Sequence, residues 1–190
     1  MNKDILSTFY HNLLPLFPPQ TEEYVERLKP QDIQKSGFRY IFSVKNMIVI
    51  SRLIEDSVIN TPGIADTHVS FQYFSRIDAQ LEQYKKVADA SKGLWLYGIP
   101  DAPLPKLART VAISTSNTPL ESYWFVVAYG AGLYATLLAE EITQPDHGQR
   151  LYEGFFTFGS ETAFQITCLL HQMFPMQTAE PIAPENQENT

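Results

Sequence analysis

The sequence lacks three features that would each point to a class of protein: paired cysteines, a long hydrophobic run and an excess of basic residues. Its single cysteine, Cys168, cannot form an internal disulfide, which is typical of a protein from a reducing compartment. The longest apolar stretch, residues 124–139, is interrupted by two glycines and is shorter than the roughly 20 apolar residues that cross a bilayer. The first residues also lack the basic and apolar regions of a signal peptide. We therefore expect a cytoplasmic protein without membrane insertion.

The charge balance is acidic, with 14 Lys and Arg against 21 Asp and Glu, for a net charge of −7. Nucleic-acid binding depends largely on Lys and Arg side chains that neutralise phosphates, so this balance argues against a nucleic-acid partner. Part of the acidic excess lies in residues 177–190, which contain several glutamates, prolines and no basic residue. That composition predicts a disordered acidic tail.

Catalytic and metal-binding motifs are also missing. The histidines fall in different predicted elements, with no pair four residues apart and no accompanying cysteine pair; they are His11, His68, His147 and His171. A zinc site would need such clustering. There is no Gly-x-Ser-x-Gly sequence, and Cys168 lies in an apolar helical pattern where a thiol is typically inert. We predict a non-enzymatic protein with no cofactor, and the weaker alternative is an unrecognised small hydrolase or transferase.

Residues 1–36 form a predicted helical extension. Apolar residues recur every four positions across residues 4–14, which predicts an amphipathic helix that Pro15 ends. Thr21 can cap a second short helix, which closes at Pro30. The sequence leaves two roles open for this extension: it packs on the domain's own sheet, or it is a surface that meets a partner.

Residues 37–176 alternate between helical and strand patterns, as in an α/β or α+β domain. Helices are predicted over residues 43–60, 75–90 and 160–174, and strands over residues 67–73, 93–99, 110–114 and 155–158, with a hairpin over residues 122–140. The order of strand, helix and strand from residue 67 to residue 99 predicts a right-handed crossover and a parallel pair. With 44% hydrophobic residues the chain can bury one sizeable core. We therefore predict a central mixed β-sheet of about five strands flanked by helices.

Three glycines have predicted structural roles. Runs of aromatic and β-branched residues flank Gly130 and Gly132, which predicts a β-hairpin whose turn requires positive φ. Gly154 stands in an aromatic strand, where glycine commonly marks a bulge or a close backbone approach. The loop from Gly130 to Ala135 also fits the Gly-x-Gly-x-x-Gly/Ala pattern of dinucleotide sites. A small-ligand or nucleotide-binding domain that uses this loop is therefore the alternative, although the segment that follows is short for the helix that such a site needs.

Three carboxylates are candidates for signal or partner binding. Glu55 and Asp56 are adjacent on a predicted helix, so their side chains diverge, and local caps or salt bridges are favoured over a shared proton. Glu153 lies among aromatic residues, where a carboxylate is costly to bury without a hydrogen bond or an arginine partner.

Aromatic residues of the hairpin are the second group of candidates. They are Tyr123, Trp124, Tyr129 and Tyr134. Because they alternate along the strands, we expect that they cannot all point inward. An outward aromatic group would be a surface for a protein partner or for a second copy of the chain.

Several segments match one family in the same order. They are Ile54-Glu55-Asp56 in the first helix, the strand and basic helix of residues 71–88, the strand of residues 95–100, and the aromatic strands of residues 123–127 and 152–158. Together these segments, spread over about residues 39–174, resemble the DICT domain, the sensory module named for its occurrence in diguanylate cyclases and two-component systems. The resemblance implies a signalling role, with light among the stimuli, and implies neither a catalytic residue nor a known ligand. We therefore predict a non-enzymatic cytoplasmic signalling protein that acts through contact with a protein partner in its pathway or through homodimer formation.

Overall fold

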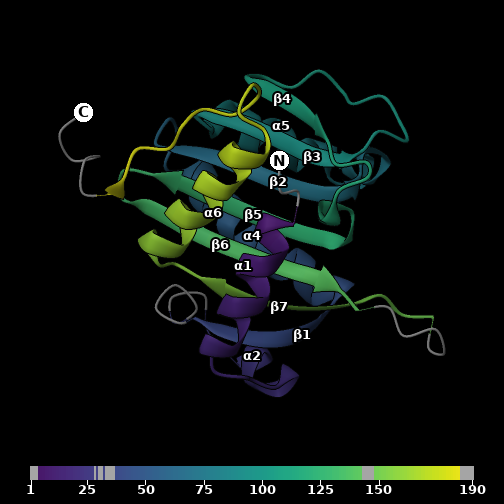
Figure 1. The fold of residues 1–190 in the computed structure, drawn as a ribbon, viewed down its shortest axis with the longest axis vertical. Coiled ribbons are helices and arrows are strands. Elements are labelled where there is room, and N and C mark those ends of the chain that lie inside the picture. The colour runs from purple at the N-terminus through teal and green to yellow at the C-terminus, as the bar shows by residue number, and fades with distance from the viewer. Residues whose placement is uncertain (1–3, 28, 30–31, 33–36, 143–147, 185–190) are drawn as a thin grey trace.

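One mixed sheet of seven strands forms the centre of the computed structural model, which describes residues 4–27, 29, 32, 37–142 and 148–184 (Figure 1). The strands are β1 (Phe38–Ser43), β2 (Ala65–Tyr73), β3 (Gly93–Ile99), β4 (Thr110–Ser114), β5 (Tyr123–Gly130), β6 (Leu133–Glu141) and β7 (Leu151–Thr157). Their order across the sheet is β1-β7-β6-β5-β2-β3-β4. The β2–β3 and β3–β4 pairs are parallel and the other pairs are antiparallel. The mixed sheet and the parallel β2–β3 pair confirm the predicted fold class.

The predicted number of strands is wrong, because the sheet has seven strands and not about five. The sequence patterns miss β1 in particular. Phe38, Tyr40 and Phe42 alternate toward the core, but the strand has six residues and passes directly into a helix at Val44. The alternation of buried residues in this short strand is therefore hard to tell apart from the helical periodicity that follows it directly.

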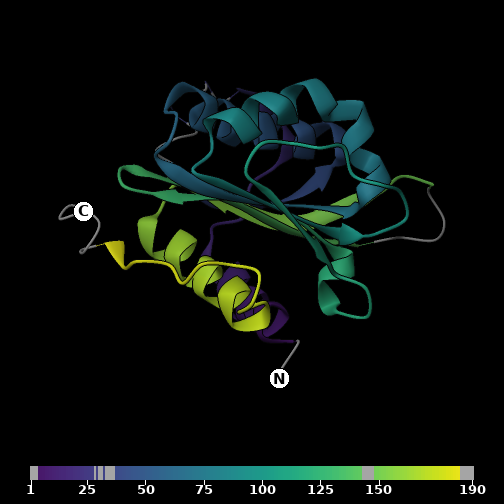
Figure 2. The ribbon, with the colours of Figure 1, turned by 90° about the horizontal axis from the view of Figure 1, so that it is seen from above.

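Helices α4 (Val44–Asn60) and α5 (Leu81–Ala90) cover one face of the sheet (Figure 2). Ser43 caps α4, since its Oγ accepts a hydrogen bond from the Asn46 N–H at 3.3 Å. Apolar residues that recur every three or four positions along α4 are buried against the sheet; they are Met47, Ile50, Ile54 and Val58. The predicted helix start at Ser75 is wrong. A 3₁₀ helix, η2 (Phe74–Gln80), precedes α5, and Ser75 Oγ donates to Asp101 Oδ2 at 2.5 Å instead of capping a helix.

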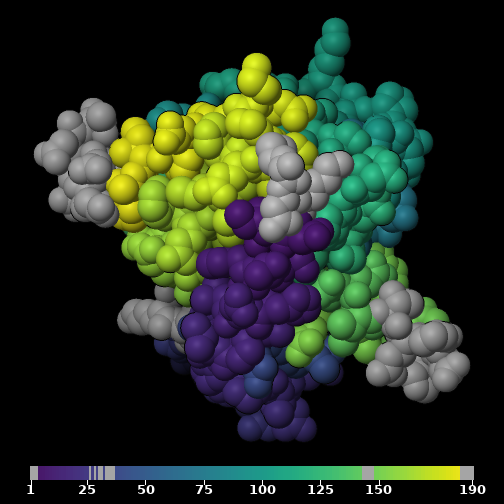
Figure 3. Space-filling view, viewed as in Figure 1, coloured from purple at the N-terminus to yellow at the C-terminus, as the bar shows by residue number. Residues whose placement is uncertain are grey.

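Helices α1 (Ile5–Leu13) and α6 (Ser160–Met173) cover the opposite face of the sheet (Figure 2). They lie side by side and contact each other (Figure 3). Leu6 and Tyr10 of α1 are buried in the same core as Ile166 and Leu170 of α6. Of the two roles left open for the N-terminal extension, α1 therefore takes the first, packing on the chain's own sheet.

Short helices occupy other connections. They are η1 (Leu14–Leu16), α2 (Glu22–Arg27) and η3 (Pro119–Ser122). α2 contacts β1, and η3 leads into β5. Over the described residues, none of the helices combines the length and the apolar character that a membrane span requires.

The predicted hairpin is formed by β5 and β6. Gly132 in its turn has φ +81°, a conformation that side chains disfavour. Gly130 and Gly154 lie where two backbones approach closely. A Cβ atom at position 130 would stand 2.6 Å from the Ala65 Cα, and one at position 154 would stand 2.5 Å from the Leu138 carbonyl oxygen. Both strands could come this close to their neighbours only with glycine at these positions.

Candidate functional site

A cavity of about 850 Å³ opens at one end of the sheet, on the face that α6 covers. β2 and β3 begin at this end and β5 ends there, since Asp66 pairs with Gly93 and Ala65 pairs with Gly130. The cavity walls come from these three strands, from Thr167 of α6 and from the segment that follows α6. Parts of the chain that are far apart in the sequence therefore meet around one space.

His68 and Trp95 form a flat aromatic wall of the cavity. Their ring centroids are 4.6 Å apart and their planes differ by 9°. The Nδ1 atom of His68 lies 2.9 Å from the Tyr97 hydroxyl. Burial lowers the pKa of His68 to about 3, because the buried imidazolium would lose its hydration. The imidazole is therefore neutral at physiological pH, and it offers the cavity an aromatic surface instead of a positive charge.

Acidic and basic groups are balanced around the cavity. The charged residues of its lining are Asp66, Glu180, Lys92 and Arg109. Burial raises the pKa of Asp66, and the positive charge of Lys92 opposes this rise. Arg109 donates to three carbonyl oxygens at the C-terminal end of α5, so its guanidinium is engaged in holding that helix end. With two acidic and two basic side chains and a neutral imidazole, the lining carries no net formal charge.

The segment after α6 lies across the cavity and is held by its walls. The Nε1 atom of Trp95 donates to the Gln177 carbonyl oxygen at 2.8 Å. The Tyr129 hydroxyl donates to the Ile182 carbonyl oxygen. Residues 177–184, which belong to the predicted disordered tail, thus contact the sheet, and the rest of that tail lies outside the described residues.

The predicted carboxylate pair of α4 separates into a buried group and an exposed group. Glu55 is fully buried, and its Oε1 accepts from the Tyr84 hydroxyl at 2.6 Å while its Oε2 accepts from Arg52 at 3.0 Å. Burial raises the pKa of Glu55, and the Tyr84 hydrogen bond and the Arg52 charge oppose this rise. Asp56 is exposed and accepts from Gln83 Nε2 at 3.0 Å. The two carboxylates therefore lie in different environments, as adjacent helical positions require.

The aromatic residues of the hairpin do not form an outward surface. Tyr123 and Tyr129 are buried in the core under α1 and α6, and Trp124 is buried in the core under α4 and α5. Tyr134 is half-buried against the first of these cores. The expectation of an outward group is wrong because helices cover both faces of the sheet, so either direction from the hairpin leads into a core.

Glu153 is half-buried in β7. Its backbone carbonyl oxygen accepts a hydrogen bond from the Tyr10 hydroxyl at 2.6 Å, which ties α1 to β7. Burial raises the pKa of Tyr10, and the charge of Glu153 adds to this effect. The contact of this residue with α1 is therefore structural.

The loop from Gly130 to Ala135 does not lead into a helix. The segment that follows is strand β6, so the helix end that would hold a pyrophosphate is not formed there. A smaller cavity of about 410 Å³ lies beside the turn, between Tyr134 and the end of α4 near Thr61. The nucleotide alternative therefore lacks its phosphate-binding element.

Histidine and cysteine side chains are dispersed. In the part of the chain that the structure describes, no three His, Cys, Asp or Glu side chains gather as a metal site would require. His11 lies 3.5 Å from a Glu140 oxygen, whereas His147 lies outside the described residues. Burial raises the pKa of Cys168, which lowers the fraction of reactive thiolate.

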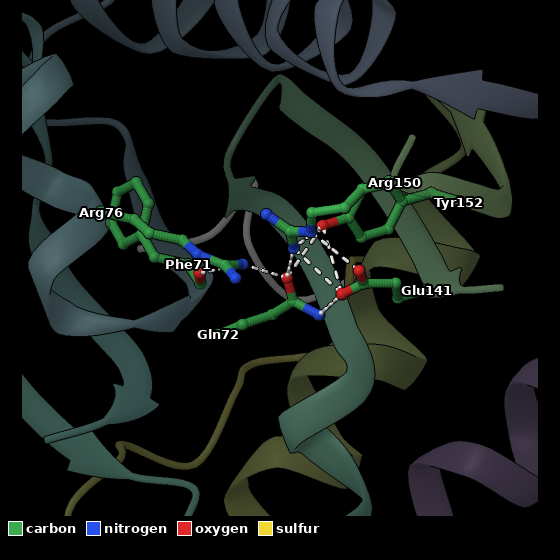
Figure 4. A network of polar contacts seen from close by, with 6 residues as sticks. All are labelled: Phe71, Gln72, Arg76, Glu141, Arg150 and Tyr152. Atoms are coloured by element: carbon green, nitrogen blue, oxygen red, sulfur yellow. Dashed lines mark hydrogen bonds and ion pairs between the residues drawn. The ribbon is translucent and has the colours of Figure 1, made fainter. Parts of the chain in front are cut away.

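A polar network at the other end of β2 joins residues that the sequence patterns do not connect (Figure 4). The Oε1 atom of Gln72 accepts hydrogen bonds from Arg76 Nη1, from Arg150 Nη2 at 2.5 Å and from the Tyr152 hydroxyl at 2.9 Å. The Nε2 atom of Gln72 donates to Glu141 Oε2 at 2.9 Å. Glu141 Oε1 also accepts from Arg150 Nε at 2.7 Å. One buried amide therefore links two arginines, a carboxylate and a phenol.

The electrostatics of this network are uneven. The hydrogen bond from Arg150 lowers the pKa of Glu141, and the carboxylate is ionised. Burial lowers the pKa of Arg76, and the positive charge of Arg150 lowers it further. The sequence gives little sign of this site, because its members lie up to 80 residues apart and belong to no motif. The available signal is that Gln72, Glu141 and Arg150 each lie near a strand end.

Comparisons with known proteins identify a matching family and a structure with a similar fold. A family model described as a sensory domain in diguanylate cyclases and two-component systems, DICT, matches residues 24–142, which include β1 to β6 and exclude β7 and α6. A comparison with curated proteins finds no match. Among solved structures, the crystal structure of polyphosphate kinase from Porphyromonas gingivalis is similar, with a TM-score of 0.56 and 9% identity. The similarity covers 86% of this chain and 30% of the kinase chain, so this chain spans less than a third of the kinase's length, and at this identity the likeness concerns the fold alone.

Proposed function

The chain belongs to the DICT family of sensory domains, and on that premise we propose that the cavity beside His68 and Trp95 is its sensing site. The main support for this proposal is that two residues of the cavity wall have a second role. Trp95 and Tyr129 line the cavity, and the same two side chains hold the segment after α6. Occupation of the cavity and the position of that segment are therefore linked through shared hydrogen-bond donors.

The lining indicates the class of ligand. A volume of about 850 Å³ falls in the range of small-molecule sites, roughly 300–1,000 Å³. The stacked rings of His68 and Trp95 offer a flat apolar surface. Because the acidic and basic side chains around them balance, an uncharged or zwitterionic aromatic molecule fits this lining better than a strongly charged one.

The signal would leave the protein through the segment after α6. A ligand that accepts the hydrogen bonds of Trp95 Nε1 and the Tyr129 hydroxyl frees the carbonyl oxygens of Gln177 and Ile182. The segment would then leave the sheet, and apolar surface beneath it would become available to a protein partner. In this proposal the output is non-enzymatic contact in a cytoplasmic signalling pathway. Where light is the stimulus, the protein receives it through a partner and does not absorb it.

The test is binding of a neutral aromatic probe, N-phenyl-1-naphthylamine, whose fluorescence rises in apolar sites. The Thr167→Phe variant places a ring into the cavity from α6, and Thr162→Phe places the same ring on the same helix outside the lining. We expect saturable binding to the wild type and to Thr162→Phe, and at least tenfold weaker binding to Thr167→Phe. Equal binding by all three proteins, with circular dichroism showing that each is folded, would reject the cavity as the site.

A further inference from the structure

Two half-buried arginines meet at one oxygen atom at the end of β2. Arg76 and Arg150 approach the Oε1 atom of Gln72 from opposite sides (Figure 4). Gln72 is 1% exposed, and the Tyr152 hydroxyl donates to the same oxygen, so the position of this acceptor is fixed. Like charges repel, and a shared acceptor holds these two guanidiniums closer than they would otherwise lie.

The positive charge at this place is not fully compensated. Glu141 neutralises Arg150, from which it accepts hydrogen bonds at 2.7 Å and 3.0 Å. Arg76 bonds to the Gln72 amide oxygen and, at 3.3 Å, to the Phe71 carbonyl oxygen, and both acceptors are neutral. Among the described residues, two guanidiniums therefore face one carboxylate, which leaves a formal charge of about +1 in a half-buried place.

Several guanidinium donors remain available there. A guanidinium carries five N–H groups in a planar fork. Within the described ranges, no acceptor meets the Nε and Nη2 atoms of Arg76 or the Nη1 atom of Arg150. One fork suffices to engage both oxygens of a carboxylate, whereas two forks from different directions suit a phosphate, which presents three acceptor oxygens.

The backbone at Gln72 supports a functional role for this arrangement. Gln72 has φ +66°, and the register of β2 against β3 shifts between Ser70 and Gln72. A side-chain-bearing residue in this conformation is strained, and such residues cluster at functional sites. The bulge turns the Gln72 amide toward both arginines. The place also lies at the carboxyl ends of the parallel strands β2 and β3, where α/β folds commonly bind ligands.

From these contacts we propose that Arg76 and Arg150 bind a phosphate group, supplied by inorganic phosphate or by a phosphomonoester. This site is separate from the cavity beside His68, since the two lie at opposite ends of β2. The phosphate would insert its oxygens between the two guanidiniums and accept hydrogen bonds from their unbonded N–H groups. Arg76 also lies over the Tyr73 ring at 4.7 Å, which restricts its side chain before any ligand arrives.

The experiment measures binding of sodium phosphate and of phenyl phosphate by calorimetry, with sodium acetate and sodium chloride at equal ionic strength. The variant is Arg76→Gln, and the matched control is Arg27→Gln, which removes the same charge from an exposed position. We expect phosphate to bind the wild type and Arg27→Gln alike, and Arg76→Gln at least tenfold more weakly. Binding of phenyl phosphate as tight as that of phosphate assigns the site to phosphomonoesters, and its rejection assigns the site to free phosphate.

Two results would overturn the proposal. One is phosphate binding that Arg76→Gln leaves unchanged, and the other is acetate binding as tight as phosphate binding. If Arg76→Gln does not fold, Arg76→Lys keeps the positive charge but loses the fork. We expect this variant to bind phosphate several-fold more weakly than the wild type, and wild-type affinity in it would contradict the geometry described above.

Discussion

The Tyr84 hydroxyl donates a 2.6 Å hydrogen bond to the Oε1 atom of Glu55 and so joins α5 to α4 inside the core. Both side chains are buried. The carboxylate has a second partner in Arg52, but burial dominates and raises the pKa of Glu55 above its usual value. Ionisation of Glu55 in the folded protein is therefore unfavourable relative to ionisation in the unfolded chain.

This relationship predicts a specific pH dependence of stability. Because the pKa of Glu55 is higher in the folded state, the folded state binds more protons between the unfolded pKa, near 4.5, and the raised folded pKa. The contribution of Glu55 is thus fully present below the unfolded pKa and is lost as pH rises through the folded pKa. We expect the free energy of unfolding of the wild type to fall over this window relative to that of Glu55→Gln, measured by urea denaturation at several pH values. Parallel curves for the two proteins would contradict the prediction.

His68 predicts the opposite dependence. Burial lowers its pKa to about 3, so the unfolded chain binds more protons than the folded protein between pH 6.5 and about 3. Stability from the neutral imidazole is present above pH 6.5 and is lost as pH falls toward 3, with an upper limit of about 5 kcal/mol. In His68→Gln the loss of unfolding free energy between pH 6.5 and pH 4 is expected to be smaller than in the wild type. The same urea series measures it, and an unchanged loss would count against a buried neutral His68.

Gly154 and Gly132 predict unequal costs for an added side chain. A Cβ at position 154 would overlap Ala139 and the Leu138 carbonyl, so Gly154→Val forces β6 and β7 apart and should cost about 3 kcal/mol or more. At position 132 a Cβ meets nothing within 4 Å, and Gly132→Ala bears only the cost of positive φ, about 1–2 kcal/mol. Thermal denaturation of the two variants should rank them in this order, and the reverse order would be inconsistent with the packing at Gly154.

The segment after α6 should loosen when its anchor is removed. Trp95→Phe keeps an aromatic ring but loses the hydrogen bond to the Gln177 carbonyl oxygen, worth about 1 kcal/mol. We expect several-fold faster amide hydrogen exchange over residues 177–184, followed by mass spectrometry. Trp124→Phe is the control, because Trp124 is buried in the other core. Equal exchange in both variants would show that Trp95 does not anchor the segment.

Local patterns in the sequence predict the helices and the hairpin well, since these depend on neighbours in the chain. The apolar stripe of α4, its cap at Ser43 and the turn at Gly132 are all local signals. It is harder to predict which side of the sheet is exposed to solvent. Every residue of β5 is buried, so the alternation along this strand carries no information about which side meets solvent. Whether helices cover one face or both is decided by α1 and α6, at the two ends of the described chain.

The candidate sites depend on long-range contacts, and the sequence therefore reveals little of them. The lining of the His68 cavity includes Trp95 and Ile182, which no local period connects. The network at Gln72 needs a bulge with positive φ at a glutamine, a conformation that composition would assign to glycine or asparagine. Glu55 shows that a predictable position in a helix does not make the environment of a side chain predictable. Its position on α4 is predictable, but its burial depends on Tyr84 of another helix.

The placement of β7 between β1 and β6 delays the pairing of β1 during synthesis of the chain. β1 begins at Phe38, and the strand with which it pairs begins at Leu151. A ribosome that adds roughly 5–20 residues per second reaches β7 on the order of 10 s after β1. By the end of that interval the residues of the hairpin and of the parallel strands have been made, but the first strand still lacks its neighbour in the sheet. β1 can thus join the sheet only after β7, the last strand of the sheet, has been made.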